Sequence, residues 1–236
     1  MAKLGNNAPN EQEGKETVEF FKELDREALN TEKFLEKYAK PLGGIFVVLV
    51  LGVLVYFGYQ QVVVAPKNAE ALKTYLSAQK NLTEGKDKEA LGGKSAANPG
   101  FLGTYDEYSS TKVGKLAGYN AALLKFKEGK YQEAYDLMDK FSSDNKTLVA
   151  MKYGVMADAQ SGLNKNTEAL SLLDQAISAA DDPYTEYYFT RKAGILALGL
   201  KKNAEAKKYF ITIDEKYQDY DNGMSDSYIE MSKYLN

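Results

Sequence analysis

The sequence contains no cysteine, no histidine and no tryptophan. The absence of cysteine excludes disulfides, thiolate metal sites and cysteine nucleophiles. The absence of histidine removes the commonest metal ligand and the usual general base near neutral pH. Few nucleophilic or acid–base schemes therefore remain, and the composition favours a protein that is not an enzyme. We expect no cofactor, no metal site and no small-molecule substrate.

A strong excess of charge of one sign is also absent. The 236 residues include 30 basic and 33 acidic side chains, which gives a net charge of −3. Nucleic acid is a poor candidate partner for a chain with this balance. The length is sufficient for one or two domains.

One long segment lacks charge completely: PLGGIFVVLVLGVLVYFGYQQVVVAP, residues 41–66. The 24 residues between its two prolines would form a helix of roughly 36 Å, enough to cross a hydrocarbon core of about 30 Å. A soluble core helix would show a polar face at 3.6-residue spacing, and this segment shows none. The segment predicts a transmembrane helix over 41–66.

A cleaved signal peptide is the competing interpretation of this segment. Signal peptides have short basic starts and apolar cores of about 7–15 residues. Here about 40 residues precede the apolar run, and Pro66 directly follows the only sequence that resembles a cleavage site, Val63-Val64-Ala65. We therefore expect an uncleaved anchor.

The flanking charges bear on the orientation of this anchor. Five basic residues lie within 22–41 and four within 66–86, a small excess that favours a cytoplasmic N-terminus and an exported C-terminal domain. Within the arm over 1–40, the first part is expected to be disordered and the second part to form an amphipathic helix. That helix either packs near the membrane or a partner, or is simply solvated.

Glycines occur along the apolar segment, and two interpretations of them stay open. Small residues allow membrane helices to approach closely, which would mark a packing face for another membrane protein. Glycine is also common in membrane helices without such a role. The glycines concerned are Gly43, Gly44, Gly52 and Gly58.

Three internal segments align with one another after the apolar run. Each has a small residue in a first helix, an alanine twelve positions later in a second helix, and a large apolar residue four positions after that. The alanines are separated by steps of 35 and 37 residues. The three sets are Ala122, Ala134 and Met138; Ala157, Ala169 and Leu173; and Gly194, Ala206 and Phe210.

This spacing is typical of tetratricopeptide repeats, whose period is 34 residues. Small residues let the two helices of a hairpin pack closely, and polar or glycine-containing turns join them. We therefore predict an all-α fold, with the transmembrane helix followed by a tetratricopeptide solenoid over 67–236. Its expected parts are a degenerate first unit over 69–91, repeats at about 112–145, 147–182 and 184–217, and a capping helix over 225–235. The stretch GGKSAANPG after the first unit cannot continue as helix. A linker that contains Phe101, Tyr105 and Tyr108 is expected to follow.

Repeats of this kind bind peptides on the surface that their first helices line. A mostly apolar and aromatic groove suits extended or helical segments, although each side chain can instead pack within the solenoid. A carboxylate clamp would need Lys, Arg and Asn at several of these positions, and only Arg191 fits. The expected groove residues are Leu116, Tyr119, Leu123, Phe126, Met151, Asp158, Tyr188, Arg191 and Ile195.

The layout resembles a family of membrane-anchored bacterial tetratricopeptide proteins that includes the ancillary subunits of the SecYEG translocon, the YfgM-like group. The resemblance rests on the short arm, the single span, the sequence VAPKNAEA and the run LGTYDEYSSTKVGKLAGYNAALLKFKEGKYQEA. It implies a single-pass protein of the bacterial inner membrane, with its repeats in the periplasm. It also implies association with the translocon, with a membrane-anchored periplasmic chaperone or prolyl isomerase, and with exported polypeptides.

Three functional hypotheses follow. The first is a binding scaffold at the translocon, and the second is an anchored adaptor for another envelope assembly or division system. The third is an enzyme that uses loop carboxylates, either Asp106 and Glu107 or Asp181 and Asp182. These acids are better explained as helix caps or turn formers.

Overall fold

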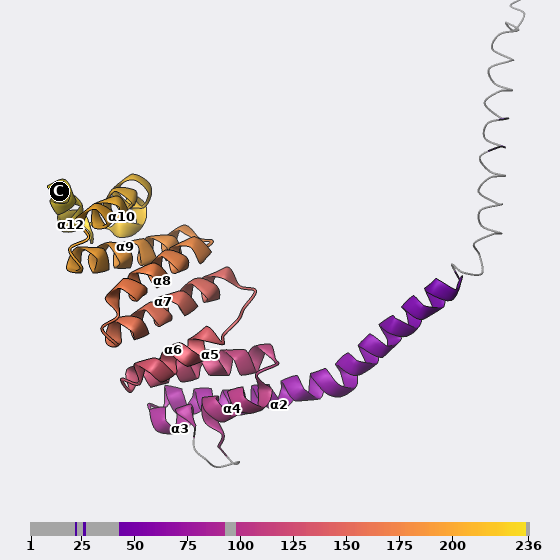
Figure 1. Ribbon diagram of the computed structural model, residues 1–236. Helices are drawn as coiled ribbons and strands as arrows, with labels where there is room; N and C mark the ends of the chain where they lie inside the picture. The colour runs from indigo at the N-terminus through magenta and orange to yellow at the C-terminus, as the bar shows by residue number, and fades with distance from the viewer. Residues whose placement is uncertain (1–21, 23–25, 27–42, 93–97, 235–236) are drawn as a thin grey trace, which may run out of the picture. The chain divides into compact units, whose positions relative to one another are not determined.

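The structure is a computed structural model that describes residues 22, 26, 43–92 and 98–234 (Figure 1). Within these residues the chain is helical and contains no β-strand. It divides into two compact units, Met1–Val63 and Val64–Asn236. The arm expected over 1–40 lies almost wholly outside the described residues. The all-helical expectation is confirmed for the part of the chain that the structure describes.

One helix runs without interruption over Gly43–Thr83 and is long and apolar enough to cross a membrane, by length and composition. Its side chains between Ile45 and Tyr59 are exposed within the first unit. The helix does not end at Pro66, where the charge-free segment ends. A π-helical turn, η1 (Gln60–Val64), precedes the proline, and Pro66 lies in the first turn of α2. The wider π register accommodates a ring that lacks an N–H donor.

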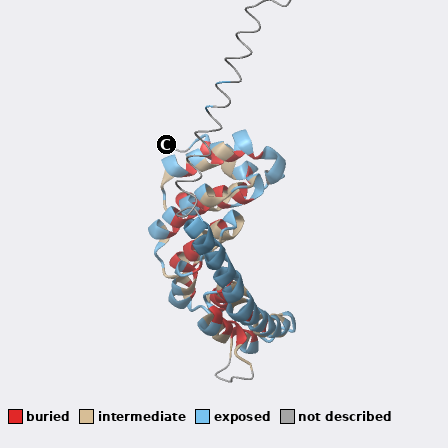
Figure 2. Ribbon diagram, turned by 90° about the vertical axis from the view of Figure 1, so that its right-hand side faces the viewer, coloured by how far each residue is buried: buried red, intermediate tan, exposed pale blue. Residues whose placement is uncertain are grey.

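The second unit is a succession of helices. In chain order they are α2 (Ala65–Thr83), α3 (Asp87–Leu91), α4 (Gly100–Tyr108), α5 (Lys112–Lys127), α6 (Tyr131–Asp139), α7 (Lys146–Gly162), α8 (Asn166–Ala179), α9 (Pro183–Gly199), α10 (Asn203–Lys216), α11 (Gln218–Asp221) and α12 (Asp226–Ser232). Helices α5 to α10 form three hairpins, and each hairpin packs against the next. The residues coloured as buried lie along the stack of these helices, and the exposed residues lie on its outside (Figure 2).

The two helices of each hairpin belong to different layers. Helix α5 contacts α7, and α7 contacts α9, whereas within the described residues α6 does not contact α8, nor α8 contact α10. The first helices therefore lie closer together than the second helices do. We call the surface formed by α5, α7 and α9 the first-helix layer.

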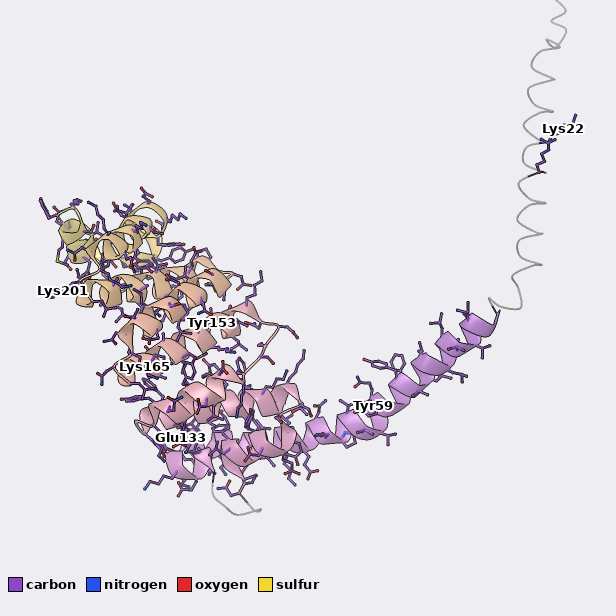
Figure 3. All side chains as sticks on the ribbon, in the orientation of Figure 1. Lys22, Tyr59, Glu133, Tyr153, Lys165 and Lys201 are labelled. Carbon is purple, nitrogen blue, oxygen red and sulfur yellow. The ribbon has the colours of Figure 1, made fainter. Side chains whose placement is uncertain are left out.

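The same turn joins the helices of every hairpin. Its central residue is left-handed in all three: Gly129 (φ 75°), Asn164 (φ 61°) and Lys201 (φ 59°). The residue after it donates its N–H to the carbonyl five positions back, as in Lys130 to Lys125 (2.9 Å). This is a Schellman motif. Lys165 and Lys201 mark the edge on which two of these turns lie (Figure 3).

The nine aligned small, alanine and large apolar positions are all buried, as the repeat predicted. The small residues are required by close contacts between helices. A Cβ on Gly154 would lie 2.3 Å from the Phe189 ring, and one on Gly194 would lie 3.0 Å from the Phe210 ring. Gly154 therefore allows α7 to pack against α9 of the next hairpin, and Gly194 allows α9 and α10 of the third hairpin to pack closely.

The pair α2 and α3 repeats the same turn, with Gly85 left-handed at φ 74° and the N–H of Lys86 donated to the Asn81 carbonyl (2.9 Å). Helix α3 is only five residues long. The expected linker after it is wrong in part, because residues 100–108 form helix α4, which packs against α2 and α5. Phe101 and Tyr108 are buried there.

Two glycines explain where helix α4 begins. Gly92 (φ 130°) and Gly100 (φ 61°) bring two backbone segments together, and a Cβ on Gly100 would lie 2.2 Å from the Cα of Gly92. At position 100, any residue other than glycine would clash with the backbone at Gly92. The chain therefore folds back on itself and starts a new helix where the composition alone indicated a break.

A candidate protein-binding surface

One cavity on the first-helix layer lies between α7 and α9, and the α8 residue Leu173 also lines it. Its volume is about 430 Å³. Four of the expected groove residues line it: Asp158, Tyr188, Arg191 and Ile195. The remaining lining residues are Ala157, Ser161, Leu173, Lys192, Leu196 and Gly199.

The negative charge of Asp158 is compensated by a lysine within this cavity. Its carboxylate forms an ion pair with Lys192, with Nζ and Oδ1 2.5 Å apart, which joins α7 to α9. The same ammonium group lies 5.9 Å from the centre of the Tyr188 ring. Tyr188 is itself 45% exposed. These contacts fix the positions of Tyr188 and Lys192 at the mouth of the cavity while the tyrosine ring stays accessible.

Arg191, unlike Asp158 and Lys192, is not held by an ion pair with a described residue. Its Nη2 donates a long hydrogen bond of 3.4 Å to the Met224 carbonyl. Its Nε is buried and has no hydrogen-bond acceptor, and the guanidinium forms no ion pair with any described carboxylate. An arginine side chain stays charged at any accessible pH. Arg191 thus presents donors that the described residues leave unsatisfied.

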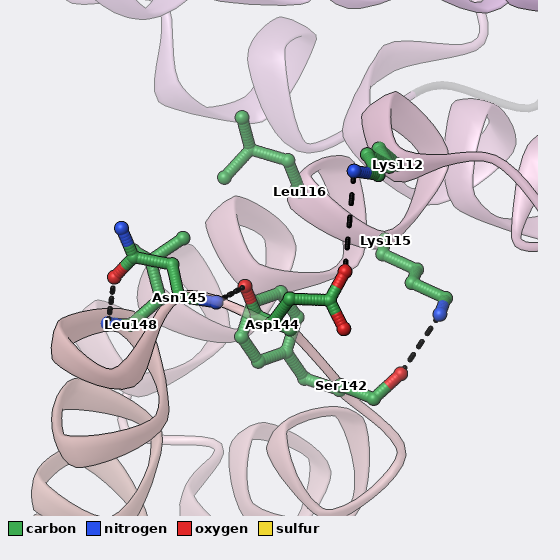
Figure 4. A pocket seen from close by; sticks show the side chains of 9 residues that line it. Lys112, Lys115, Leu116, Ser142, Asp144, Asn145 and Leu148 are labelled. Atoms are coloured by element: carbon green, nitrogen blue, oxygen red, sulfur yellow. Dashed lines mark hydrogen bonds and ion pairs between the residues drawn. The ribbon is translucent and has the colours of Figure 1, made fainter. Parts of the chain in front are cut away.

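A second, larger cavity of about 570 Å³ lies where α5 and α7 begin (Figure 4). Leu116 is the only expected groove residue that lines it. Its other lining residues are Lys112, Lys115, Phe141, Ser142, Ser143, Asp144, Asn145 and Leu148.

The polar side chains of this second cavity satisfy one another. Lys115 donates to the Ser142 hydroxyl (2.9 Å), and Asn145 caps α7 by accepting from the Leu148 N–H (2.9 Å). Lys112 forms a loose ion pair with Asp144 (3.9 Å). The polar groups of the second cavity are therefore already paired at the junction between two hairpins.

The four other expected groove residues lie outside both cavities. Tyr119 packs on Phe141 with ring centres 5.2 Å apart, and burial raises the pKa of its phenol. Phe126 packs on Tyr131 at the hairpin turn, with ring centres 5.2 Å apart. Met151 is half-buried against the core, and Leu123 is 37% exposed. Of these four residues, Leu123 offers the most exposed side chain.

Lys192 and Leu196 line the cavity but were not among the expected residues. Lys192 follows Tyr188 by four positions, and Leu196 follows Lys192 by four. This spacing places all three side chains on one face of a helix. The sequence therefore held a signal for them, although nothing in it indicated the pairing of Lys192 with Asp158.

The candidate catalytic carboxylates do not converge. Asp106 and Glu107 are exposed on α4, a helix where a loop was expected. Asp182 caps α9 by accepting from the Thr185 N–H (2.8 Å), and hydrogen bonds from the Thr185 hydroxyl and N–H lower the pKa of its carboxyl. The expected capping role of Asp182 is confirmed. No group of three carboxylates suited to a metal ion occurs within the described residues.

The glycines of the apolar segment are open on all sides. Within the described residues, no atom would lie within 4 Å of a Cβ placed on Gly43, Gly44, Gly52 or Gly58. Their role in helix packing stays a prediction. Compared with models of known protein families and with curated protein sequences, the chain shows no significant match.

Proposed function

We propose that this chain is a membrane-anchored tetratricopeptide repeat protein that binds other proteins and performs no catalysis. The observation that carries the proposal is the first-helix layer, which combines a cavity, an exposed tyrosine and an arginine that forms no ion pair with the described residues. Tyrosine and arginine are enriched where proteins bind one another. The cavity holds no converging catalytic groups.

The repeat assignment is supported by more than the spacing of alanines. Three hairpins share one turn geometry, and a fourth copy of that turn joins α2 to α3. Neighbouring first helices contact each other and the second helices do not, which is the arrangement that a curved stack of hairpins requires. Helix α12 then covers the last hairpin, since it packs against α10.

We further propose that the helix over Gly43–Thr83 crosses the bacterial inner membrane through its apolar part, with the N-terminus in the cytoplasm and the repeats in the periplasm. The small excess of basic residues before the apolar segment supports this orientation. The resemblance to the YfgM-like group suggests the host complex. On that basis the partners are the SecYEG translocon, a membrane-anchored periplasmic chaperone or prolyl isomerase, and exported polypeptides.

Affinity purification of the full chain from a mild detergent tests this function. We expect SecYEG subunits in the eluate, and their absence from an eluate of an unrelated single-span protein of equal abundance. An eluate that contains envelope assembly or division proteins without translocon subunits would contradict the translocon proposal. It would favour the adaptor hypothesis instead.

A further inference from the structure

The charges of the hairpins are divided between the two helix layers. Helices α5, α7 and α9 carry eight basic and two acidic residues, whereas the second helices α6, α8 and α10 carry eight acidic and three basic residues. The near-neutral net charge of the chain conceals this division. The first-helix layer is thus the basic surface of the three hairpins.

Part of this positive charge is already neutralised. Four of the eight cations form ion pairs, such as Lys125 with Glu133 (2.7 Å). The other four form no ion pair with a described residue. They are Lys115, Lys146, Lys152 and Arg191. Lys115 and Lys152 donate instead to uncharged oxygens of the loop between α6 and α7. The layer therefore keeps a net positive charge toward a ligand.

From these features we infer that the first-helix layer binds an acidic, apolar segment of a partner protein, with one carboxylate on Arg191 and one apolar side chain in the neighbouring cavity. This inference rests on the proposed protein-binding function and names the chemistry of the partner. Arg191 supplies charge-assisted donors in the fork geometry that a carboxylate accepts. Because Nε is buried, the carboxylate would accept from the terminal nitrogens of the guanidinium group, of which Nη2 makes only a long bond in the free chain.

The cavity beside Arg191 explains why the ligand is amphipathic. Leu173, Ile195 and Leu196 line its walls together with the Tyr188 ring. Burial of an apolar side chain against these groups contributes affinity that a simple anion cannot gain. Tyr184, one helical turn before Tyr188, is 59% exposed and extends the aromatic surface along α9.

These features favour a protein segment over an anionic lipid surface. A bilayer surface offers phosphates to any exposed lysine, but it has no single apolar side chain to place in a cavity between two helices. A peptide offers both groups a few ångströms apart. Vesicles of anionic lipid therefore serve as the competing probe.

Fluorescence anisotropy with the full chain in nanodiscs of uncharged lipid tests the inference. The probe is a labelled twelve-residue peptide in which Asp and Glu alternate with Leu and Phe, and its control carries Asn and Gln in place of the acids. We expect the acidic peptide to bind at least tenfold more tightly than its amide control. We expect Arg191→Gln to lower the affinity for the acidic peptide at least tenfold. The same variant should bind the amide peptide as the unmodified chain does.

Two further variants keep the test specific. Arg191→Lys retains the charge without the planar fork, so its affinity should lie between those of the unmodified chain and Arg191→Gln. Lys208→Gln removes an exposed cation from α10, outside the first-helix layer, and should not alter binding. Circular dichroism of each variant reports whether the helices are intact.

Equal affinity for the two peptides would overturn the inference, as would an Arg191→Gln variant that still distinguishes them. Arg191-dependent binding to anionic vesicles without peptide binding would overturn it in favour of a lipid ligand. None of these results changes which proteins co-purify with the full chain. The purification above therefore tests the proposed function separately.

Discussion

The rings of Phe210 and Tyr228 are stacked face to face, with their centres 5.3 Å apart and their planes inclined by 5°. Phe210 is the large apolar residue of the third hairpin, and it is fully buried. Tyr228 belongs to α12, the helix that covers the open end of the stack. The final helix thus places an aromatic ring on the position that a further repeat would otherwise cover.

The first prediction concerns this cap. Tyr228→Ala removes the stacked ring and exposes Phe210, so the free energy of unfolding should fall by about 2 kcal/mol. Tyr228→Phe keeps the ring and should leave stability unchanged. Urea unfolding of the full chain in detergent, followed by circular dichroism, measures both variants. Equal stability of the alanine and phenylalanine variants would show that α12 does not cover the stack.

The second prediction concerns the hairpin turns. Lys201 adopts a left-handed conformation that disfavours a side chain, whereas Gly129 occupies the equivalent position at no steric cost. Lys201→Gly should therefore raise the free energy of unfolding by about 1 kcal/mol, and Gly129→Ala should lower it by a similar amount. Thermal unfolding of the two variants and of the unmodified chain measures both changes in stability. A loss of stability in Lys201→Gly would contradict the shared turn geometry.

The third prediction compares two helical glycines, Gly154 in the middle of α7 and Gly199 at the end of α9. A methyl group at Gly154 would lie 2.3 Å from the Phe189 ring, whereas nothing lies within 4 Å of one at Gly199. Gly154→Ala should destabilise the domain by about 2 kcal/mol through overpacking. Gly199→Ala should be neutral or slightly stabilising because alanine favours helix. Chemical unfolding midpoints measure both, and similar effects of the two changes would exclude the close contact.

The fourth prediction concerns acid stability. The folded-state pKa of Asp182 is lowered by its hydrogen bonds from Thr185, so its contribution to stability is present above the unfolded-state pKa. That contribution is lost as the pH falls through the lowered folded-state pKa. Asp182→Asn keeps a capping oxygen without the titrating group, and Asp182→Ala should cost about 1 kcal/mol at neutral pH.

Unfolding free energies measured from pH 7 down to pH 2 test this behaviour. The unmodified chain should lose more stability across the acid range than Asp182→Asn does, because only the former must protonate its cap. Parallel pH profiles for the two proteins would show that Asp182 does not cap α9 through its carboxylate.

The buried positions of the hairpins were predictable because small and apolar residues recur there at a regular spacing in the sequence. Ala134, Ala169 and Ala206 are conspicuous in the sequence because two helices approach too closely there for a larger side chain. Helix α4 was not predictable in this way. Its start depends on the contact between Gly92 and Gly100, and the glycines that permit this contact are the same residues that indicate a break.

The candidate site was predictable only in part. Asp158, Tyr188, Arg191 and Ile195 meet because α7 and α9 lie side by side, which the repeat register implies. Tyr119 and Phe126 share that register but pack on aromatic rings within their own hairpin and connection, since Phe141 and Tyr131 lie within reach. A register assigns a residue to a face of a helix, but neighbouring side chains decide whether it stays accessible.

Photocrosslinking in cells that produce the full chain tests binding by the first-helix layer most directly. A photoreactive residue at Tyr188 on α9 is compared with one at Gln175, an exposed residue of α8 outside that layer. We predict crosslinks from position 188 to a translocon subunit, a periplasmic chaperone or an exported polypeptide, with little product from position 175. Crosslinks to such proteins from position 175 and none from position 188 would contradict the assignment of the binding surface.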